Sequence, residues 1–412
     1  MLAVSQAALV ICRGVSLKVK LSNNLLVAVL QVMLAVCRGV KMENHISDIN
    51  IQTFRGIRNL ELKNVNQINI LTGDNNSGKT SILEVIQSYQ NPADIREWRS
   101  LLRRNTQGRM TSDITYYEGF YDLFNINDDE KKVEYSILLD SGENHNVSMS
   151  AKESLEEILE KDYEKIRGFS IAEGDGQQDD NVRTVAKMEI SISLDGKEVR
   201  EHDIYDGQVM LPYKNDEACA AYAYDGRIIY ISPVRHAEGN VYLRKVLDYP
   251  ELYEQMLQVL REYDDDIISI NYDVDENRYG RGSYKILSKA NRKALPLNVY
   301  GDGMKKAVLL MSAVIAAKDG ILLLDEFETA IHTSAMTRTF KWILETCIKL
   351  NVQVFLTSHS REAIDKLLKC SQDSLDKISV YTLYKDDEGM SVRQLSGRKA
   401  IEAQDEMGLE LR

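Results

Sequence analysis

The stretch "LTGDNNSGKT", residues 71–80, decides the fold of this chain. It fits the pattern G-x-x-x-x-G-K-[ST], which is typical of phosphate-binding loops. Alternating apolar residues before it predict three short strands, at about 46–53, 59–63 and 68–72. The segment after it, "SILEVIQSY", has the apolar spacing of an amphipathic helix. A glycine turn between a strand and a helix is the context that a P-loop requires.

The residue types of the turn match the chemistry of a triphosphate. Gly73 and Gly78 allow backbone torsions and a close approach that a side chain would block. The N–H groups of the turn then point at the β-phosphate, at the positive end of the following helix. Lys79 reaches the β- and γ-phosphates, and the Thr80 hydroxyl binds Mg²⁺. The residues predicted to hold ATP with Mg²⁺ are Gly73, Asp74, Asn75, Asn76, Ser77, Gly78, Lys79, Thr80 and Ser81.

The second half of the site is predicted far along the chain, in "DGILLLDEFETAIH". Its four apolar residues, 321–324, suit a strand that is buried on both faces of a parallel sheet. At the carboxyl end of this strand we expect Asp325 to hold Mg²⁺ and Glu326 to position and polarise the attacking water. A third strand, in "NVQVFLTSHS", ends at His359, which we interpret as a sensor of the γ-phosphate. Glu326, His359 and Lys79 form the predicted catalytic set.

A glycine turn opens the helix that leads into this Asp-Glu strand. It lies in "NVYGDGMKKAVLLMSAVIAA", residues 298–317, where Gly301, Asp302 and Gly303 precede a long apolar segment. Asp325 follows Gly301 by 24 residues, a spacing that resembles the signature motif of ABC-type ATPases. By itself, a G-x-G turn before a helix is equally compatible with simple helix capping.

Together these motifs resemble the ABC-type ATPases related to RecF, to the heads of structural-maintenance-of-chromosomes (SMC) proteins and to the overcoming-lysogenization-defect (OLD) nucleases. The chain looks most like the small bacterial OLD-like ATP-binding proteins, many of which belong to anti-phage systems. The resemblance covers residues 46–90 and 290–412 firmly and the middle loosely. It is carried by "FRGI" (54–57), "GDNNSGKT", "YGDGMKK", "LLLDEFETAIH", "LTSHS" and "MGLELR".

The resemblance implies a fold and a mechanism. The implied fold class is α/β: a P-loop NTPase of ABC-ATPase type, with a mixed sheet and a long α/β insert between the P-loop and the signature motif. Two heads are expected to pair head to tail as a homodimer or higher oligomer, with each ATP between the P-loop of one chain and Gly301–Gly303 of the other. Arg55 resembles the family's Phe-Arg/Lys element near the nucleotide, or it is a surface arginine. Glu328 and His332 either line the seam between the heads or are structural.

The motifs divide the chain into four expected parts. These are a non-native or disordered extension (1–41), the first part of the head with the P-loop (42–95), an α/β insert (96–290) and the second part of the head (291–412). No heptad repeat in the insert is long enough for a long coiled coil. No residue is assigned to the Q-loop, for which the sequence offers only two poor candidates, Gln87 and Gln90.

Within the insert, "KKVEYSILLD", "AKMEISISLDG" and "RIIYISPVRH" are predicted as strands. "SAKESLEEILEKDYEKIRG" and "RKVLDYPELYEQMLQVLREYDDD" have the spacing of two amphipathic helices, with the polar loop "EGDGQQDDN" between them. The stretch "DIREWRSLLRRNTQGR" holds five arginines and Trp98 within 16 residues. It either grips nucleic acid or is a solvated helix face with salt bridges.

Composition limits the class of protein. The chain has 412 residues and a formal net charge of −12, which argues against a nucleic-acid coat over the whole surface. No C-x-x-C pair occurs, so the cysteines are expected to be reduced thiols in the cytoplasm rather than a disulfide frame or a zinc site. They are Cys12, Cys37, Cys219, Cys347 and Cys370.

The first 41 residues differ from the rest of the sequence. "LVICRGVSLK" and "LAVCRGVKME" nearly repeat each other, and no acidic residue precedes Glu43. We expect an upstream mis-start, with Met42 as the real first residue; a peripheral membrane anchor and an ordinary extension remain open. The apolar run "LLVAVLQVMLAV" is too short to span a bilayer, so no stable membrane span is expected.

The leading functional hypothesis is a cytoplasmic ATPase switch that controls a separate effector nuclease or toxin, or nucleic acid, in anti-phage defence. The alternative is a RecF-like DNA-repair clamp in which ATP gates duplex binding. The ATPase half of a transporter has the least support. A Toprim nuclease domain does not fit into the 53 residues after His359, so we expect ATP hydrolysis without cleavage of nucleic acid.

Overall fold

The computed structural model describes residues 44–102, 115–167, 181–209, 211, 220–233, 235, 241–274, 282–291, 293–386 and 389–407. The expected extension, residues 1–41, lies outside these ranges, as do most of the loop "EGDGQQDDN" and the second half of the arginine-rich stretch. No helix within the described ranges is long and apolar enough to cross a membrane.

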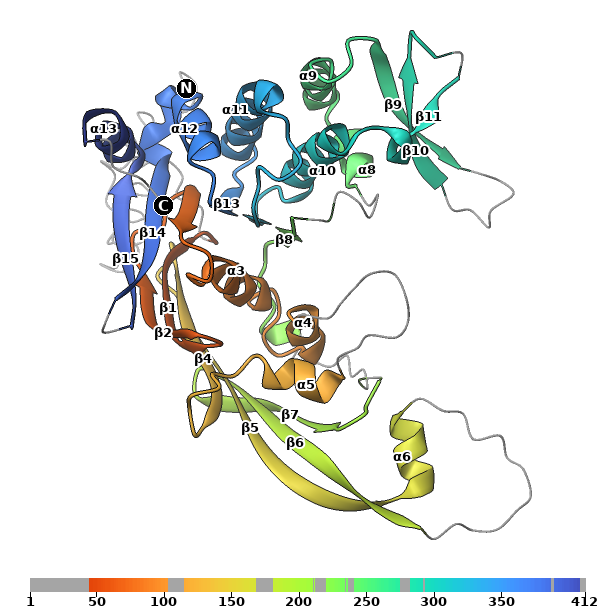
Figure 1. Cartoon of the computed structure of the whole chain (residues 1–412), viewed down its shortest axis with the longest axis vertical. Helices are drawn as coiled ribbons and strands as arrows, with labels where there is room; N and C mark the ends of the chain where they lie inside the picture. Colours follow the sequence, from red (N-terminus) through yellow and green to blue (C-terminus); the bar gives the residue numbers. More distant parts are fainter. Residues whose placement is uncertain are drawn as a thin grey trace, which may run out of the picture. The chain divides into compact units, whose positions relative to one another are not determined.

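A six-stranded mixed sheet carries the predicted nucleotide motifs (Figure 1). Its order is β15-β14-β3-β13-β12-β8, in which only β15 runs antiparallel to its neighbour. Leu324 of β12 lies opposite both Ile231 of β8 and Leu356 of β13, so the carboxyl ends of these strands meet at one edge. The strands are β3 (Ile68–Gly73), β8 (Ile228–Ile231), β12 (Ile321–Leu324), β13 (Gln353–Thr357), β14 (Ile378–Asp386) and β15 (Gly389–Ser396).

Both faces of this sheet are covered, which explains the continuous apolar run of β12. Leu322 and Leu324 belong to a core that the sheet shares with α10, α11 and α12, whereas Ile321 and Leu323 belong to a second core shared with α3. All four side chains are at most 1% exposed. The helices around the sheet are α3 (Lys79–Ser88), α10 (Asp302–Ala316), α11 (Thr333–Lys349), α12 (Arg361–Lys369) and α13 (Gly397–Met407), with the 3₁₀ turn η3 (Gln372–Lys377) before β14.

The second core continues into an antiparallel sheet of order β2-β1-β4-β5-β6-β7. The strands predicted near residues 46–53 and 59–63, and those in "KKVEYSILLD" and "AKMEISISLDG", are confirmed here. Two short helices, α4 (Ile95–Ser100) and α5 (Tyr116–Tyr121), also contribute to this core. The strands are β1 (Ile46–Phe54), β2 (Ile57–Leu62), β4 (Lys131–Leu139), β5 (Asn144–Leu159), β6 (Val182–Leu194) and β7 (Lys197–Tyr205).

The predicted helix in "SAKESLEEILEKDYEKIRG" is wrong over most of its length. Strand β5 continues to Leu159, and only α6 (Glu160–Ile166) is helical. Strands β5 and β6 pair without interruption from Val147 opposite Leu194 to Leu159 opposite Val182. This backbone ladder overrides the helical spacing, because residues 152–155 are exposed and no apolar stripe is buried that a helix could use.

The segment "RKVLDYPELYEQMLQVLREYDDD" was predicted as one helix and forms two. Pro250 has no N–H group and begins a new helix, so α8 (Leu243–Val246) ends before α9 (Pro250–Leu260) starts. A small sheet of order β11-β10-β9 follows α9. Its strands are β9 (Ile267–Val274), β10 (Gly282–Ser288) and β11 (Leu295–Pro296), and the 3₁₀ turn η2 (Leu297–Val299) leads to α10.

Candidate nucleotide-binding site

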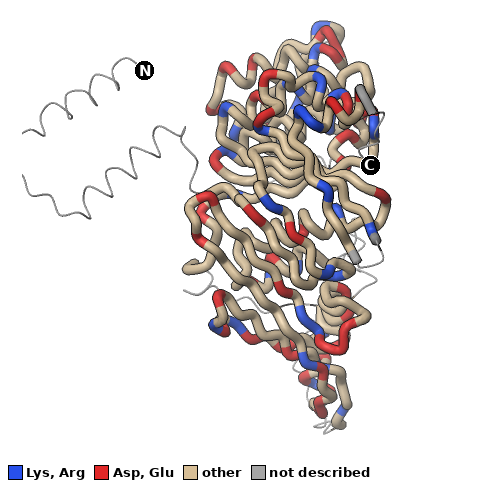
Figure 2. The backbone as a smooth tube through the Cα atoms, turned by 90° about the vertical axis from the view of Figure 1, so that its left-hand side faces the viewer, with Lys and Arg blue, Asp and Glu red and all other residues tan. Residues whose placement is uncertain are grey.

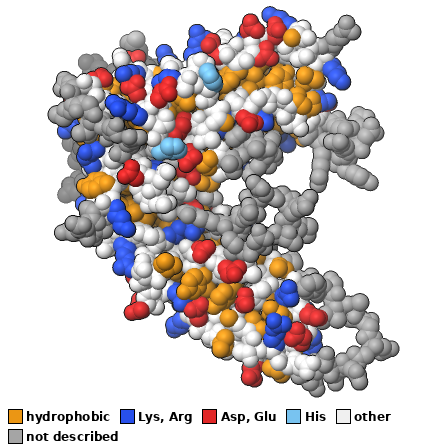
Figure 3. All heavy atoms as spheres, viewed as in Figure 1, with side chains coloured by type: hydrophobic (Ala, Val, Ile, Leu, Met, Phe, Trp, Pro, Cys, Tyr) orange, Lys and Arg blue, Asp and Glu red, His pale blue; other side chains and the backbone are white. Residues whose placement is uncertain are grey.

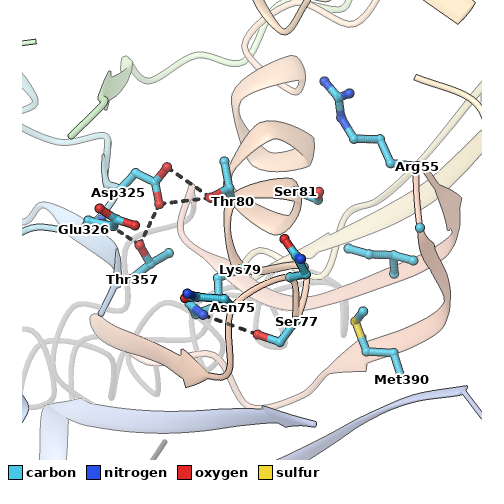
Figure 4. Close-up of a pocket in the computed structure, with 14 residues that line it drawn as sticks. Arg55, Asn75, Ser77, Lys79, Thr80, Ser81, Asp325, Glu326, Thr357 and Met390 are labelled. Carbon is cyan, nitrogen blue, oxygen red and sulfur yellow. Dashed lines mark hydrogen bonds between the residues drawn. The ribbon is translucent and has the colours of Figure 1, made fainter. Parts of the chain in front are cut away.

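A cavity of about 590 Å³ lies where the P-loop meets the carboxyl ends of β12 and β13 (Figure 4). It brings together residues from the two ends of the chain. The lining residues are Arg55, Gly56, Ile57, Asn75, Asn76, Ser77, Gly78, Lys79, Thr80, Ser81, Asp325, Glu326, Thr357 and Met390.

The loop between β3 and α3 has the backbone that its glycines predict. Gly73 has φ +134°, and a Cβ atom there would lie 2.3 Å from the carbonyl oxygen of Leu383 on the neighbouring strand. Gly78 has φ +80°. Both torsions lie in the region that favours glycine. The Lys79 ammonium donates to the carbonyl oxygens of Gly73 and Asp74, each at 2.7 Å, and burial lowers the pKa of Lys79.

Asp325 is the centre of a cluster of oxygen atoms. The Thr80 hydroxyl donates to its two carboxylate oxygens at 3.2 and 3.1 Å. The Thr357 hydroxyl donates to the same carboxylate at 2.7 Å, and the Tyr230 hydroxyl donates at 3.1 Å. Carboxylate and hydroxyl oxygens are the hard donors that Mg²⁺ requires, so the residues present fit this ion.

Glu326 and His359 lie next to each other at the ends of adjacent strands. Nδ1 of His359 is 3.8 Å from Oε1 of Glu326, and the two side chains are 52% and 42% exposed, which leaves both accessible to a ligand. The Glu326 N–H donates to the Thr357 hydroxyl at 2.8 Å, and Glu326 has φ +43°. The same threonine therefore fixes the Asp325 carboxylate and the Glu326 backbone. His359 itself does not line the cavity.

Two buried ionisable side chains, Lys306 and Glu328, interact electrostatically with the residues at the carboxyl end of β12. Lys306 on α10 is fully buried, and its ammonium donates to the Pro233 carbonyl oxygen at 3.3 Å. Burial lowers the pKa of Lys306 to about 8, opposed by Glu328 and then by Asp325 and Glu326. Glu328 is 8% exposed and accepts from the Ser358 hydroxyl at 2.8 Å. Burial raises the pKa of Glu328.

Arg55 lies in the turn between β1 and β2, with φ +52°. Its guanidinium points away from the P-loop (Figure 4). Nε is 2.9 Å from the Glu84 carboxylate of α3, and the same side chain donates to the carbonyl oxygens of Leu101 and Asp122 at 2.8 and 3.0 Å. Arg55 thus ties the P-loop helix to α4 and α5, while its backbone borders the cavity.

The turn Gly301–Gly303 is not among the residues that line the cavity. Gly301 precedes α10 with ordinary torsions, and a Cβ atom there would meet no atom within 4 Å. A Cβ atom on Gly303 would lie 3.0 Å from the Ala330 carbonyl oxygen. Within one chain, therefore, the predicted signature turn and the P-loop do not share a site.

The remaining candidates have local structural contacts. His332 precedes α11, and its Nδ1 accepts from the Ser334 N–H at 3.3 Å. The Gln90 amide bonds to backbone groups at the start of β8, including the Ile228 N–H at 2.7 Å, and Gln87 bonds to Ser100. Neither glutamine lines the cavity.

The described half of the arginine-rich stretch is partly a core element. Trp98 is fully buried, and its Nε1 donates to the Pro92 carbonyl oxygen at 2.9 Å. Arg96 bonds to Asp94, the residue that caps α4. Trp98 therefore fills the interior rather than offering an exposed ring to a base. Figure 2 shows acidic and basic residues interspersed along the described backbone.

Thr357 and Tyr230 were not predicted as site residues from the sequence. Both stand at or near the carboxyl end of a strand adjacent to β12, which is the signal that could have found them. Ile57 and Met390 were also missed. Ile57 reaches the cavity from β2, which belongs to the other sheet, and Met390 reaches it from β15, near the far end of the chain.

Comparison with known protein families gives one match over most of the chain. Residues 68–365 match the family described as "AAA domain, putative AbiEii toxin, Type IV TA system". The chain belongs to this family. The match confirms the expected class, an ABC-type AAA ATPase of the RecF, SMC and OLD kind, and the expected α/β fold.

Individual relatives are more distant. The chain is 22% identical over 379 residues to a Helicobacter pylori protein named "ATP/GTP phosphatase", covering 85% of this chain and 96% of that protein. It is 32% identical over 113 residues to an uncharacterized protein of Methanocaldococcus jannaschii, covering 27% and 98%. Among solved structures, a Pyrococcus furiosus Smc head bound to the C-terminal domain of ScpA matches with a TM-score of 0.46 at 13% identity, covering 89% of this chain and 100% of that chain. The SMC head domain from Thermotoga maritima matches with a TM-score of 0.42 at 11% identity, covering 85% and 99%.

Proposed function

We propose that the chain binds ATP with Mg²⁺ in this cavity and hydrolyses it, and that the nucleotide switches the pairing of two copies of the chain. The observation that carries the proposal is the convergence of Lys79, Thr80 and Asp325 at one edge of the mixed sheet. Membership of an AAA ATPase family and similarity to a protein named "ATP/GTP phosphatase" support nucleotide hydrolysis.

The positions of the side chains support separate roles. Mg²⁺, when held by Thr80 and Asp325, supplies positive charge to the phosphate oxygens. The Lys79 ammonium, which now bonds to loop carbonyls, is placed to bond to phosphate oxygens instead. The half-exposed Glu326 carboxylate orients the attacking water, and the His359 ring lies 3.8 Å from this carboxylate.

The proposed pairing rests on the turn Gly301–Gly303. The turn lies outside the cavity of its own chain, and Gly301 is exposed with free space around it. The described part of the chain therefore leaves this turn accessible to a second copy. In the proposed dimer each ATP lies between the P-loop of one copy and Gly301–Gly303 of the other.

Glu326→Gln tests both parts of the proposal. The amide keeps the shape of the side chain but removes the carboxylate, so hydrolysis falls by about 10²-fold or more while ATP binding persists. Retained ATP then holds the copies together, and sedimentation detects ATP-dependent dimers. Adding Gly301→Glu places a negative charge against the triphosphate of the partner and abolishes these dimers. A Cβ atom at this position meets no described atom of its own chain within 4 Å, so the substitution is expected to leave the fold intact.

The matched control is Ser141→Glu, which adds the same charge to an exposed turn of the antiparallel sheet. It leaves the dimers intact. A mixture of Lys79→Ala and Gly301→Glu chains recovers part of the turnover, because one composite site in a mixed dimer is complete. If Gly301→Glu chains alone hydrolyse ATP at the wild-type rate, the turn is only a helix cap and the shared site is wrong.

We further propose that the paired state controls a separate effector in anti-phage defence. The family description, which names a putative toxin and a type IV toxin–antitoxin system, supports an effector of this kind. Affinity capture on Glu326→Gln chains with ATP, compared with the same variant without nucleotide, identifies proteins that bind the paired state.

A further inference from the structure

The cavity has two chemically different ends. Lys79, Thr80, Asp325, Glu326 and Thr357 occupy the end that the proposed hydrolysis assigns to the phosphates and Mg²⁺. Met390 lies on the opposite side of the P-loop from Asp325, Glu326 and Thr357, on the same side as Arg55 (Figure 4). Gly56 and Ile57 line the same cavity. Because the phosphates are fixed at the first end, the nucleoside extends toward the second.

Two apolar side chains, Ile57 and Met390, close this second end, and we call them the apolar bracket. Both side chains pack against the P-loop at Gly78. A Cβ atom on Gly78 would lie 3.1 Å from Sδ and Cε of Met390 and 3.2 Å from Cγ1 of Ile57. Met390 follows the turn of the β14–β15 hairpin, opposite Lys385, and Ile57 begins β2. The bracket therefore joins the C-terminal hairpin to the N-terminal sheet beside the loop.

One polar side chain at this end, Arg55, is held by partners outside the cavity. The Arg55 guanidinium bonds to Glu84 and to two carbonyl oxygens. Ser81 is 8% exposed on α3. Among the described residues that line the cavity, none has an aromatic ring on which a base could stack. The two side chains of the apolar bracket offer a base only aliphatic and thioether surface.

From this geometry we propose that Ile57 and Met390 hold the nucleobase by apolar and sulfur–aromatic contact and leave its hydrogen-bonding edge unread, so that the site accepts ATP and GTP alike. This inference rests on the proposed hydrolysis. Methionine makes favourable contacts with any aromatic ring and adapts to its shape. A site that bonds to a polar substrate group discriminates by about 10⁴-fold or more, whereas an apolar surface reaches only roughly 10–200-fold. We expect kcat/KM for ATP and GTP to agree within about tenfold.

The test compares ATP and GTP on four forms of the full chain: wild type, Met390→Ala, Met390→Leu and Val392→Ala. Met390→Ala removes half of the bracket, so KM rises about three- to tenfold for both nucleotides while kcat is unchanged, because the phosphate end is intact. Met390→Leu restores apolar contact and stays close to wild type. Val392→Ala truncates an apolar side chain on the same strand, away from the cavity lining, and is the matched control.

Calorimetry with ADP and GDP gives a second reading that does not depend on turnover. Met390→Ala weakens both diphosphates equally if the bracket holds the base. A wild-type preference for ATP over GTP above about 100-fold, or unchanged KM and binding constants in Met390→Ala, overturns the inference while leaving the hydrolysis proposal in place. Absence of any triphosphate hydrolysis by wild type overturns the proposed function, and the diphosphate titrations then still decide the role of the bracket.

Discussion

Lys79 in the mixed sheet and Lys187 in the antiparallel sheet show how two regions of one chain use the same side chain differently. Lys187 on β6 lies between Glu156, Glu189 and Asp203, at 3.3, 3.0 and 3.1 Å. Hydrogen bonds to these acids raise the pKa of Lys187, whereas burial lowers the pKa of Lys79.

A lysine that is already surrounded by three carboxylates has little affinity for a phosphate. The cavity beside Lys187 has a volume of about 430 Å³, and its lining includes four acidic residues: Glu189, Glu198, Glu201 and Asp203. Side chains of both charges also cover the region of the antiparallel sheet in Figure 3. Cavity volume and a central lysine thus do not define a nucleotide site. At Lys79, by contrast, the ammonium bonds to carbonyl oxygens of a glycine turn at the start of a helix, which is the setting of a phosphate site.

Replacing each of the two lysines with alanine tests whether only Lys79 supports ATP hydrolysis. Lys79→Ala removes the charge that contacts the β- and γ-phosphates in the proposed site, so we expect turnover to fall by about 10²-fold or more. Lys187→Ala leaves turnover within about twofold of wild type, because its partners lie on the exposed sheet. Steady-state phosphate release measures both.

Circular dichroism checks that both variants keep the fold. Equal loss of turnover in the two variants would mean that the antiparallel sheet supports the chemistry, and the contrast between the two regions would be lost.

A third lysine, Lys306, is expected to make the free energy of unfolding depend on pH. Lys306 is fully buried beneath the site, and its pKa is lowered to about 8 from 10.5. Between these two values the unfolded chain binds more protons at this position than the folded chain, so the Lys306 contribution to the free energy of unfolding rises with pH. Below pH 8 both states bind the proton and this contribution is constant.

Lys306→Met removes this dependence. Any stability advantage of the variant over wild type at pH 7 therefore shrinks between pH 8 and pH 10, by at most about 3 kcal/mol. Thermal melting of the two proteins at pH 7, 8, 9 and 10 measures the difference. Lys341→Met, which removes a lysine from the exposed surface of α11, is the matched control for the loss of one charge. A difference between Lys306→Met and wild type that stays constant over this range contradicts the assignment.

The parts of the molecule that were predicted correctly are those whose signal is local. The P-loop, the buried strand before Asp325 and the alternating strands of the antiparallel sheet each follow from residues adjacent in sequence. Tyr230, Lys306 and Met390 reach the site through strand order and helix packing, which connect residues far apart in the chain. No local pattern marks Lys306 or Met390, whereas Tyr230 lies near the carboxyl end of a strand that was predicted.

The helix predicted over most of residues 150–168 is wrong for a different reason, because part of this segment belongs to strand β5. Residues 152–159 have the helical spacing of charged and apolar side chains, but their backbone is paired with β6 to its end. Strand β6 follows β5 after a long connection, so the hydrogen bonds between the two strands cannot be inferred from the local spacing of residues in β5. These hydrogen bonds outweigh differences in helix propensity, which are on the order of a few tenths of a kcal/mol per residue.

The smallest predicted effect compares the same substitution in strand β5 and in helix α6, where it should change stability in opposite directions. Glu157 is exposed on β5 opposite Thr184, and Glu164 is exposed on α6 seven residues later. Threonine favours strands, particularly opposite another threonine, and disfavours helices. Glu157→Thr therefore stabilises the β5–β6 ladder by about 0.5 kcal/mol and slows amide hydrogen exchange in residues 182–187 about twofold. Glu164→Thr, the same substitution in a helix, destabilises α6 by roughly 0.3 kcal/mol and speeds exchange in residues 160–166. If both substitutions speed exchange, residues 152–159 are helical in solution and the original prediction from the sequence is right after all.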